Sequence, residues 1–192
     1  AKAFATSLGS STALIGLIIM MGAGLGVLMS EAFGAGETAR LKETLATTLL
    51  FGALLCCGAA AAGCLLTPWI LRATAVPSSI FEITGVYLRI TFLGAPFTFF
   101  YNALAAGLKS VGDSKTPLFF LVLSSVLNVI LDLAFILIFK LGVLGASLAT
   151  VLSQAISGVL CLLFIMVKVP ILHITRSEWR PQSKRMTELC TY

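Results

Sequence analysis

Long apolar runs separated by short polar turns dominate this sequence. Each run is longer than the roughly 20 apolar residues that a helix needs to cross a bilayer. A transmembrane β-barrel would instead show short segments of alternating hydrophobicity. The pattern predicts an all-α, polytopic transmembrane helical bundle with five spans and a polar connection or tail at 173–192. The expected spans lie at about 7–30, 44–71, 80–108, 117–140 and 145–168.

The composition supports a membrane protein. The chain is 58% hydrophobic and only 11% charged, with a mean hydropathy of +1.04, whereas soluble proteins carry roughly 25% charged residues. A net charge of +5 could indicate nucleic-acid binding in a soluble protein. Here the basic residues cluster between apolar runs, as membrane topology requires. We therefore expect a lipid bilayer as the surrounding medium and no nucleic-acid partner.

The distribution of Lys and Arg predicts the orientation, because cytoplasmic loops are enriched in these residues. One set of alternate loops carries three, Lys2, Arg72 and Lys140, while Arg89 lies inside a run. The other set carries nine and is assigned to the cytoplasm, which places the C-terminal end inside a plasma (inner) membrane. Five crossings then start the chain outside. Since the sequence also does not begin with Met, we expect at least one helix to be missing from the front. The nine are Arg40, Lys42, Lys109, Lys115, Lys168, Arg176, Arg180, Lys184 and Arg185.

The sequence contains no motif that indicates an enzyme. No nucleophile–base pair, metal-ligand spacing or nucleotide motif is present, and Gly112-Asp113 lacks the remaining glycines and the GK[ST] ending of a phosphate loop. Cysteine in an apolar run behaves as a small hydrophobe, and the spacing fits neither a disulfide framework nor a zinc site. We expect no enzyme and no cofactor. The five cysteines are Cys56, Cys57, Cys64, Cys161 and Cys190.

The fourth run carries an ionisable residue, Asp132, where hydrocarbon is expected, with Asn128 one helical turn before it. A carboxylate at that depth costs on the order of 2.5–3.5 kcal/mol and usually has a function. Residues four apart project from one helical face, so the two side chains can offer oxygen ligands to Na⁺ or a site for H⁺. The alternative is a structural ion pair between Asp132 and Arg89, in which each charge lowers the cost of the other. Such a pair could also break and re-form during transport, which makes Arg89 a candidate residue for a substrate cavity or for gating.

Other polar residues are candidates with plain structural alternatives. Thr150 is a candidate neutral ligand, although threonine in a membrane helix commonly bonds its own backbone. Gln154, one turn later, is a candidate for a substrate cavity. Tyr101 belongs to an aromatic group that could bind flat cations or simply pack, and Asn102 follows it. Pro96 removes a helical hydrogen bond and predicts a kink that is a candidate moving element.

The start of the fourth helix is also predicted by local signals. Thr116 can cap this helix, and Pro117 suits the first helical position.

Three motifs in this order resemble the multidrug and toxic compound extrusion (MATE) family. They are Gly112-Asp113-Ser114-Lys115-Thr116-Pro117, Asn128-x-x-x-Asp132, and the segment from Gly142 to Thr150. The segment from Ser30 to Gly36 is similar to the family's loop after its second helix, and Tyr87-Leu88-Arg89-Ile90 with Pro96 is similar to its fourth helix. The resemblance extends to about Ile174 and covers helices two to six of twelve.

The resemblance implies a secondary antiporter of two six-helix lobes that exports organic cations and other amphipathic compounds in exchange for Na⁺ or H⁺. Its coupling site in the amino-terminal lobe would include Asp132, Asn128 and Thr150. The family's first helix, which carries a further acid, and its second lobe would be missing partners of this chain. Family members often have an asparagine where this sequence has Ala105. Asn102, one turn earlier, is a candidate substitute, and the choice between Na⁺ and H⁺ stays open.

Two alternatives remain beside export of organic cations. Flippases for lipid-linked saccharides have similar folds with strongly cationic cavities, and Arg89 alone inside the runs argues against that function. The chain could also be a non-transporting membrane scaffold whose polar residues only hold helices together.

Overall fold

The fold is described from a computed structural model over residues 26–74 and 76–172. This part of the chain is helical and contains no strand, which confirms the predicted all-α class. A helical stretch at 26–34 precedes the long helices. Most of the expected span at 7–30, and the expected tail at 173–192, lie outside the described residues. The elements are α2 (Thr38–Ala73), α3 (Ser78–Ser110), α4 (Lys115–Leu133), the π-helical turn η1 (Ala134–Ile138), α5 (Val143–Lys168) and the 3₁₀ turn η2 (Pro170–Leu172).

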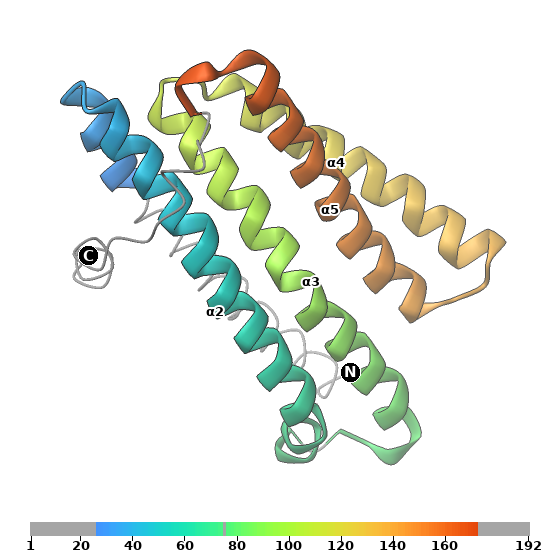
Figure 1. The fold of residues 1–192 in the computed structure, drawn as a ribbon. Helices are drawn as coiled ribbons and strands as arrows, with labels where there is room; N and C mark the ends of the chain where they lie inside the picture. The colour runs from blue at the N-terminus through green and yellow to red at the C-terminus, as the bar shows by residue number, and fades with distance from the viewer. Residues whose placement is uncertain (1–25, 75, 173–192) are drawn as a thin grey trace.

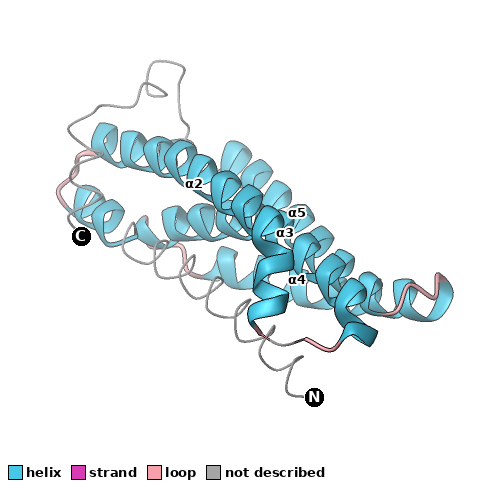
Figure 2. Ribbon diagram, turned by 90° about the horizontal axis from the view of Figure 1, so that it is seen from below, coloured by secondary structure: helices cyan, strands magenta, loops and turns pink. Residues whose placement is uncertain are grey.

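The four long helices lie side by side, and successive helices run in opposite directions (Figure 1). Short loops join them (Figure 2). Helix α3 packs against both α2 and α5, whereas α4 packs mainly against α5 and touches α3 little. In the part that the structure describes, four helices are long and apolar enough to cross a membrane, with η1 extending α4.

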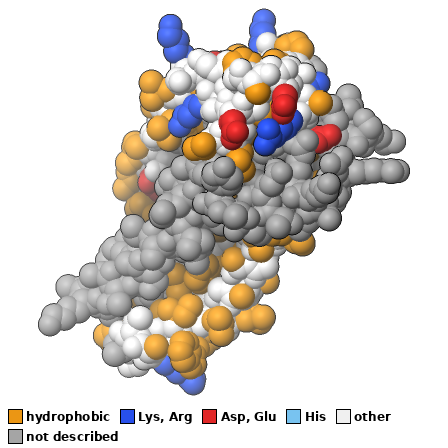
Figure 3. All heavy atoms as spheres, turned by 90° about the vertical axis from the view of Figure 1, so that its left-hand side faces the viewer, with side chains coloured by type: hydrophobic (Ala, Val, Ile, Leu, Met, Phe, Trp, Pro, Cys, Tyr) orange, Lys and Arg blue, Asp and Glu red, His pale blue; other side chains and the backbone are white. Residues whose placement is uncertain are grey.

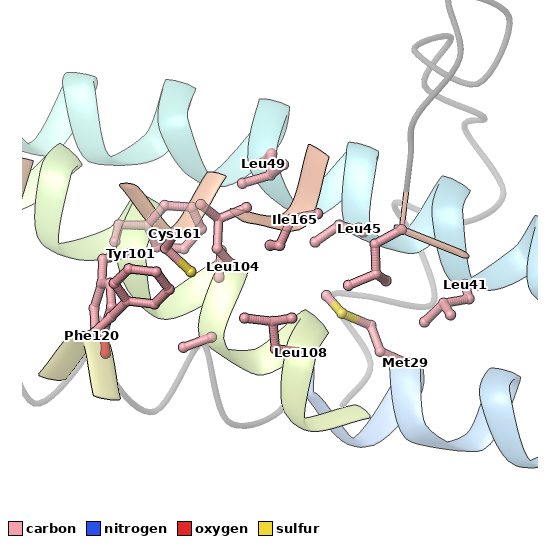
Figure 4. Close-up of a cluster of buried hydrophobic side chains, with 14 of the residues drawn as sticks. Met29, Leu41, Leu45, Leu49, Tyr101, Leu104, Leu108, Phe120, Cys161 and Ile165 are labelled. Atoms are coloured by element: carbon pink, nitrogen blue, oxygen red, sulfur yellow. The ribbon is translucent and has the colours of Figure 1, made fainter. Parts of the chain in front are cut away.

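The buried core lies where α2, α3 and α5 meet. It is close to the end of the bundle at which α2 starts and α5 finishes. Figure 4 shows these side chains pointing toward one another from neighbouring helices. Helix α4 contributes little to the core, since only Pro117, Phe120 and Ser124 of this helix are buried. Its outer face is therefore available to lipid or to another helix. The labelled core residues are Met29, Leu41, Leu45, Leu49, Tyr101, Leu104, Leu108, Phe120, Cys161 and Ile165.

Two glycines of α2 allow α3 to approach closely. A Cβ atom built on Gly52 would overlap the ring of Phe99, and one on Gly63 would come within 2.7 Å of the ring of Phe92. Small residues at such positions let helix backbones approach in membranes, where close packing drives helix association. The α2–α3 contact therefore depends on two aromatic rings of α3 that pack directly against glycines of α2.

The start of α4 differs from the sequence prediction. The helix begins at Lys115, so Pro117 is its third residue rather than its first. Thr116 does not cap the helix; instead its backbone N–H donates a 3.0 Å hydrogen bond to Oδ1 of Asp113. A carboxylate oxygen that accepts from an unpaired N–H of the first turn is a preferred form of N-terminal capping. The N-cap residue is Ser114, which makes no side-chain capping bond, and the carboxylate that accepts from the first turn belongs to Asp113, one residue earlier.

Helix α3 continues through Pro96 from Ser78 to Ser110. Proline has no N–H, so the carbonyl of Phe92, four residues earlier, loses its helical donor. Membrane helices tolerate such a position where neighbouring helices surround it. The kink expected at Pro96 stays a prediction.

Candidate functional site

Two of the predicted site residues meet across the α4–α5 contact. The amide Nδ2 of Asn128 donates a 3.3 Å hydrogen bond to Oγ1 of Thr150. The Thr150 hydroxyl in turn donates to the carbonyl of Ala146, one turn back in its own helix, at 3.0 Å. Thr150 thus makes the backbone contact expected of a membrane threonine and also accepts from the neighbouring helix. The amide oxygen of Asn128 takes no part in this bond and is a candidate neutral ligand.

Asp132 lies one turn after Asn128 on α4 and is half-buried. Its Oδ1 atom is buried and finds no hydrogen-bond partner among the described residues. Buried polar atoms are almost always paired because desolvation without a partner is costly. The Asp132 carboxylate can therefore bind a cation or a proton, or accept a hydrogen bond from a residue outside the described range.

Arg89 does not neutralise Asp132 in this structure. Arg40 and Glu37 form an ion pair at 3.3 Å, whereas Arg89 and Asp132 do not pair with each other. Arg89 is exposed on α3, a helix that makes few contacts with α4 because α5 packs against both. The alternative of a permanent Asp132–Arg89 pair is therefore not the arrangement observed.

Helix α4 passes from α-helical to π-helical hydrogen bonding shortly after Asp132. The turn η1 begins at Ala134, two residues later, and its widened hydrogen bonding ends with the N–H of Phe139 donating to the carbonyl of Ala134. π-Helical turns are rare inside helices and also occur where helices end, as η1 does here. Sequence reasoning missed this feature, since the segment Ala-Phe-Ile-Leu-Ile contains no glycine or proline to signal it.

Tyr101 and Asn102, both on α3, are engaged in structural contacts. Tyr101 is 5% exposed, and its hydroxyl donates to the carbonyl of Pro117 at 2.8 Å, which ties α3 to the start of α4. Asn102 donates through Nδ2 to the carbonyl of Thr98 in its own helix at 2.7 Å. Pro96, a turn and a half before Asn102, is half-buried. These α3 residues do not join the α4–α5 cluster.

Gln154 lies one turn beyond Thr150 on α5 and is half-buried. It shares a helical face with Thr150 because the two residues are four apart. Thr150 and Gln154 thus place two polar side chains along one face of α5, the helix that packs against both α3 and α4.

The ligand set of this cluster suits a hard monovalent cation or a proton. Asp132 would supply charge, and Asn128 and Thr150 would supply neutral oxygens, the ligand type that hard cations prefer. The described residues include no group of three or more His, Cys, Asp or Glu side chains placed to hold a metal.

Known sequences and structures resemble this chain over most of its length. The sequence profile of the MatE family matches residues 3–134. The "Probable multidrug resistance protein YoeA" of Bacillus subtilis is 36% identical over 156 residues, covering 79% of this chain and 34% of that protein. The "Multidrug export protein MepA" of Staphylococcus saprophyticus is 27% identical over 176 residues, covering 92% of this chain and 39% of that protein.

A solved structure shares the fold. It is described as the outward-facing conformation of a multidrug resistance MATE family transporter of the MOP superfamily, and it matches with a TM-score of 0.90 and 22% sequence identity. The match covers 98% of this chain and 42% of that structure. The chain thus spans between one third and one half of the length of the proteins that it resembles.

Proposed function

Because the chain belongs to the MatE family of integral, multi-pass membrane transporters, we propose that it forms most of the amino-terminal lobe of a secondary antiporter. This antiporter exports amphipathic organic cations in exchange for Na⁺ or H⁺. Members of the family are transporters rather than enzymes. The curated relatives are named for multidrug resistance and multidrug export, which supports drug export as the activity of the whole protein.

The observation that carries the proposal is the buried Oδ1 of Asp132 without a partner, one turn from the Asn128–Thr150 hydrogen bond. An ionisable residue within a membrane helix marks an ion pathway more often than a structural contact. Here the competing structural explanation, a pair with Arg89, is not formed. The cluster is therefore the coupling site of the proposal, with Asp132 as its charged group.

Binding at Asp132 can drive transport if the two arrangements of the lobes hold the ion with different affinity. A ligand shifts a conformational equilibrium only by its differential affinity for the two states. Two-lobed transporters alternate access largely by rocking one half against the other around a site near the bilayer midplane. Competition between the coupling ion and the organic cation for the same carboxylate is sufficient to exchange one for the other.

The proposed orientation places the basic ends of the helices, with Lys42, Lys109, Lys115 and Lys168, at the cytoplasmic face of a plasma membrane. Figure 3 shows Lys and Arg side chains gathered toward one end of the molecule, as the excess of these residues in cytoplasmic loops predicts. The proposed partners are the bilayer, the organic cation, a preceding helix with a second acid, and the other lobe.

Efflux of a fluorescent organic cation by the full-length protein tests the proposal. We expect Asp132→Asn to abolish efflux driven by a Na⁺ or pH gradient, while Glu82→Gln, which removes an exposed carboxylate near the start of α3, leaves it intact. Efflux that is unchanged in Asp132→Asn would remove this residue from the coupling site. Absence of any gradient-driven efflux by the wild-type protein would favour a scaffold or the flipping of an anionic lipid-linked saccharide.

A further inference from the structure

An apolar hollow lies away from the α4–α5 cluster, where α2, α3, α5 and η2 meet. Its volume is about 600 Å³, within the range of roughly 300–1,000 Å³ typical of ligand sites. Every lining residue is apolar. The lining residues are Leu45, Leu49, Leu50 and Ala53 of α2, Phe100 and Leu104 of α3, Leu162, Ile165 and Met166 of α5, and Leu172 of η2.

The hollow begins at one end of the bundle and extends along the helices. Leu172 belongs to the short turn after α5, and Leu45 lies two turns into α2, so both mark the end at which α2 begins and α5 finishes (Figure 1). Ala53 lies two turns deeper along α2. A hollow that starts at a helix end and follows the helix axes has the direction of a lipid chain in the same membrane.

Lys42 lies one turn before the lining residue Leu45 on α2, at the end of the hollow that we call its mouth. It precedes Leu45, Leu49 and Ala53 by three, seven and eleven residues, spacings that put all four side chains on one face of α2. Lys42 is half-buried, as expected of a lysine whose stem lies along an apolar surface with its ammonium group in water. This face of α2 thus carries a cation, Lys42, followed by three apolar residues that line the hollow.

Two further features make this mouth attractive to an anion. Lys168, the last residue of α5, is exposed three residues after the lining residue Ile165. The start of α2 adds unpaired backbone N–H groups, because Glu37 at its N-cap makes no side-chain capping bond, and such helix starts favour negative charge. Arg40 is paired with Glu37, so the proposed anion contacts are assigned to Lys42 and Lys168 rather than to Arg40.

We propose that this hollow binds one acyl chain of an anionic phospholipid from the leaflet at the basic end of the bundle. The headgroup phosphate lies at Lys42, with Lys168 nearby. Charge complementarity selects a phospholipid over a purely apolar occupant, since a basic side chain near the membrane surface gains about 1 kcal/mol from anionic lipid. This site is independent of the transport proposal, because it shares no residue with the cluster around Asp132.

Native mass spectrometry of the delipidated full-length protein tests this site, with phosphatidylglycerol and phosphatidylcholine of identical chains as probes. We expect the wild-type protein to bind phosphatidylglycerol about fivefold more tightly, the factor that 1 kcal/mol represents. Lys42→Gln should bring the two affinities close together. Arg72→Gln, which removes a basic residue at the far end of the same helix, should preserve the preference.

The apolar wall is tested by filling the hollow. Ala53→Phe should abolish tight binding of both lipids, whereas Leu54→Phe, at an exposed neighbouring position outside the hollow, should not. If Ala53→Phe fails to fold, Met166→Phe serves the same purpose from the exposed rim on α5, with Val167→Phe as its control. The proposal is overturned if the preference for phosphatidylglycerol survives in Lys42→Gln. It is equally overturned if the folded filling variants bind lipid like the wild type, or if cross-linking places another protein segment in the hollow.

Discussion

Nδ2 of Asn128 and Oγ1 of Thr150 are joined by a 3.3 Å hydrogen bond that links α4 to α5, one helical turn from the buried Asp132 carboxylate. The bond places two neutral oxygen-bearing side chains beside the only acidic residue of the expected fourth span. It also links α4 to α5 one turn before Asp132. The contact therefore has both a structural and a ligand-positioning role.

The strength of this contact can be measured by a double-mutant cycle with Asn128→Ala and Thr150→Val. Interhelical hydrogen bonds in membrane proteins contribute about 0.6 kcal/mol on average and at most about 1.7 kcal/mol. We expect a coupling free energy in that range from unfolding of the full-length protein in detergent, and Thr150→Ser should retain it. Strictly additive effects of the two substitutions would show that the bond contributes nothing to stability.

Binding of Na⁺ at Asp132 should stabilise the folded protein. A ligand at one hundred times its Kd adds about 2.7 kcal/mol to the free energy of unfolding. We expect the Tm of the full-length protein to rise in NaCl relative to KCl of equal ionic strength, and the rise to disappear in Asp132→Asn. A rise of the same size in that variant would place the Na⁺ elsewhere. No rise in the wild type, combined with efflux driven by a pH gradient, would identify H⁺ as the coupling ion.

Close packing of α2 on α3 should make Gly52 intolerant of a side chain. A methyl group there overlaps the ring of Phe99, which is itself almost fully buried. Overpacking of this kind typically costs about 1–3 kcal/mol, so Gly52→Ala should lower the Tm. Gly58→Ala is the matched control on the same helix, since no atom lies within 4 Å of its added Cβ. The control should be neutral or stabilising by roughly 0.5–1 kcal/mol, because alanine favours helix more than glycine does.

The sequence was sufficient to predict the helical class and the shared face of Asn128 and Asp132. Both depend on local periodicity: continuous apolar runs give spanning helices, and a separation of four gives one helical face. The Asn128–Thr150 contact joins residues 22 apart. Its residues could be named as candidates, but the contact itself depends on how α4 and α5 pack, which local periodicity does not determine.

Features decided by backbone geometry or by packing between helices were not predictable. The turn η1 follows an apolar run without glycine or proline, and nothing in that run signals a widened turn. The distance between Arg89 and Asp132 depends on α5 packing against both α3 and α4, which the sequence pattern does not specify. The importance of Gly52 likewise appears only when Phe99 is placed over it.

Lys140 has a backbone conformation that favours glycine. Its φ is +56°, and it lies at the end of η1, where the N–H of Leu141 returns to the carbonyl of Phe135 at 2.9 Å. A left-handed conformation costs a side-chain-bearing residue roughly 1–2 kcal/mol, so we expect Lys140→Gly to raise the Tm of the full-length protein. Gly142, with φ +54°, provides the reverse test, and Gly142→Ala should lower the Tm. If both substitutions shift the Tm in the same direction, this explanation of the turn is wrong.

The cap at the start of α4 predicts a dependence of stability on pH. Hydrogen bonds from Thr116, through its side chain and its backbone N–H, hold the pKa of the Asp113 carboxyl below its ordinary value of 3.8. A cap of this kind is worth about 1 kcal/mol, so Asp113→Ala should lower the free energy of unfolding by roughly that amount at pH 7. Glu82→Ala, at an exposed carboxylate, serves as the control and should have little effect.

The sign of the pH effect follows from the direction of this pKa shift. A carboxyl group with a lowered pKa in the folded state binds its proton less readily there than in the unfolded chain, so protonation favours unfolding. The stabilisation by Asp113 is therefore complete above pH 3.8 and is lost as the pH falls through the lower pKa of the folded state. The difference in Tm between wild type and Asp113→Ala should stay constant from pH 7 to about pH 5 and shrink below pH 4. A difference that persists undiminished in strong acid would mean that the capping oxygen acts without its charge.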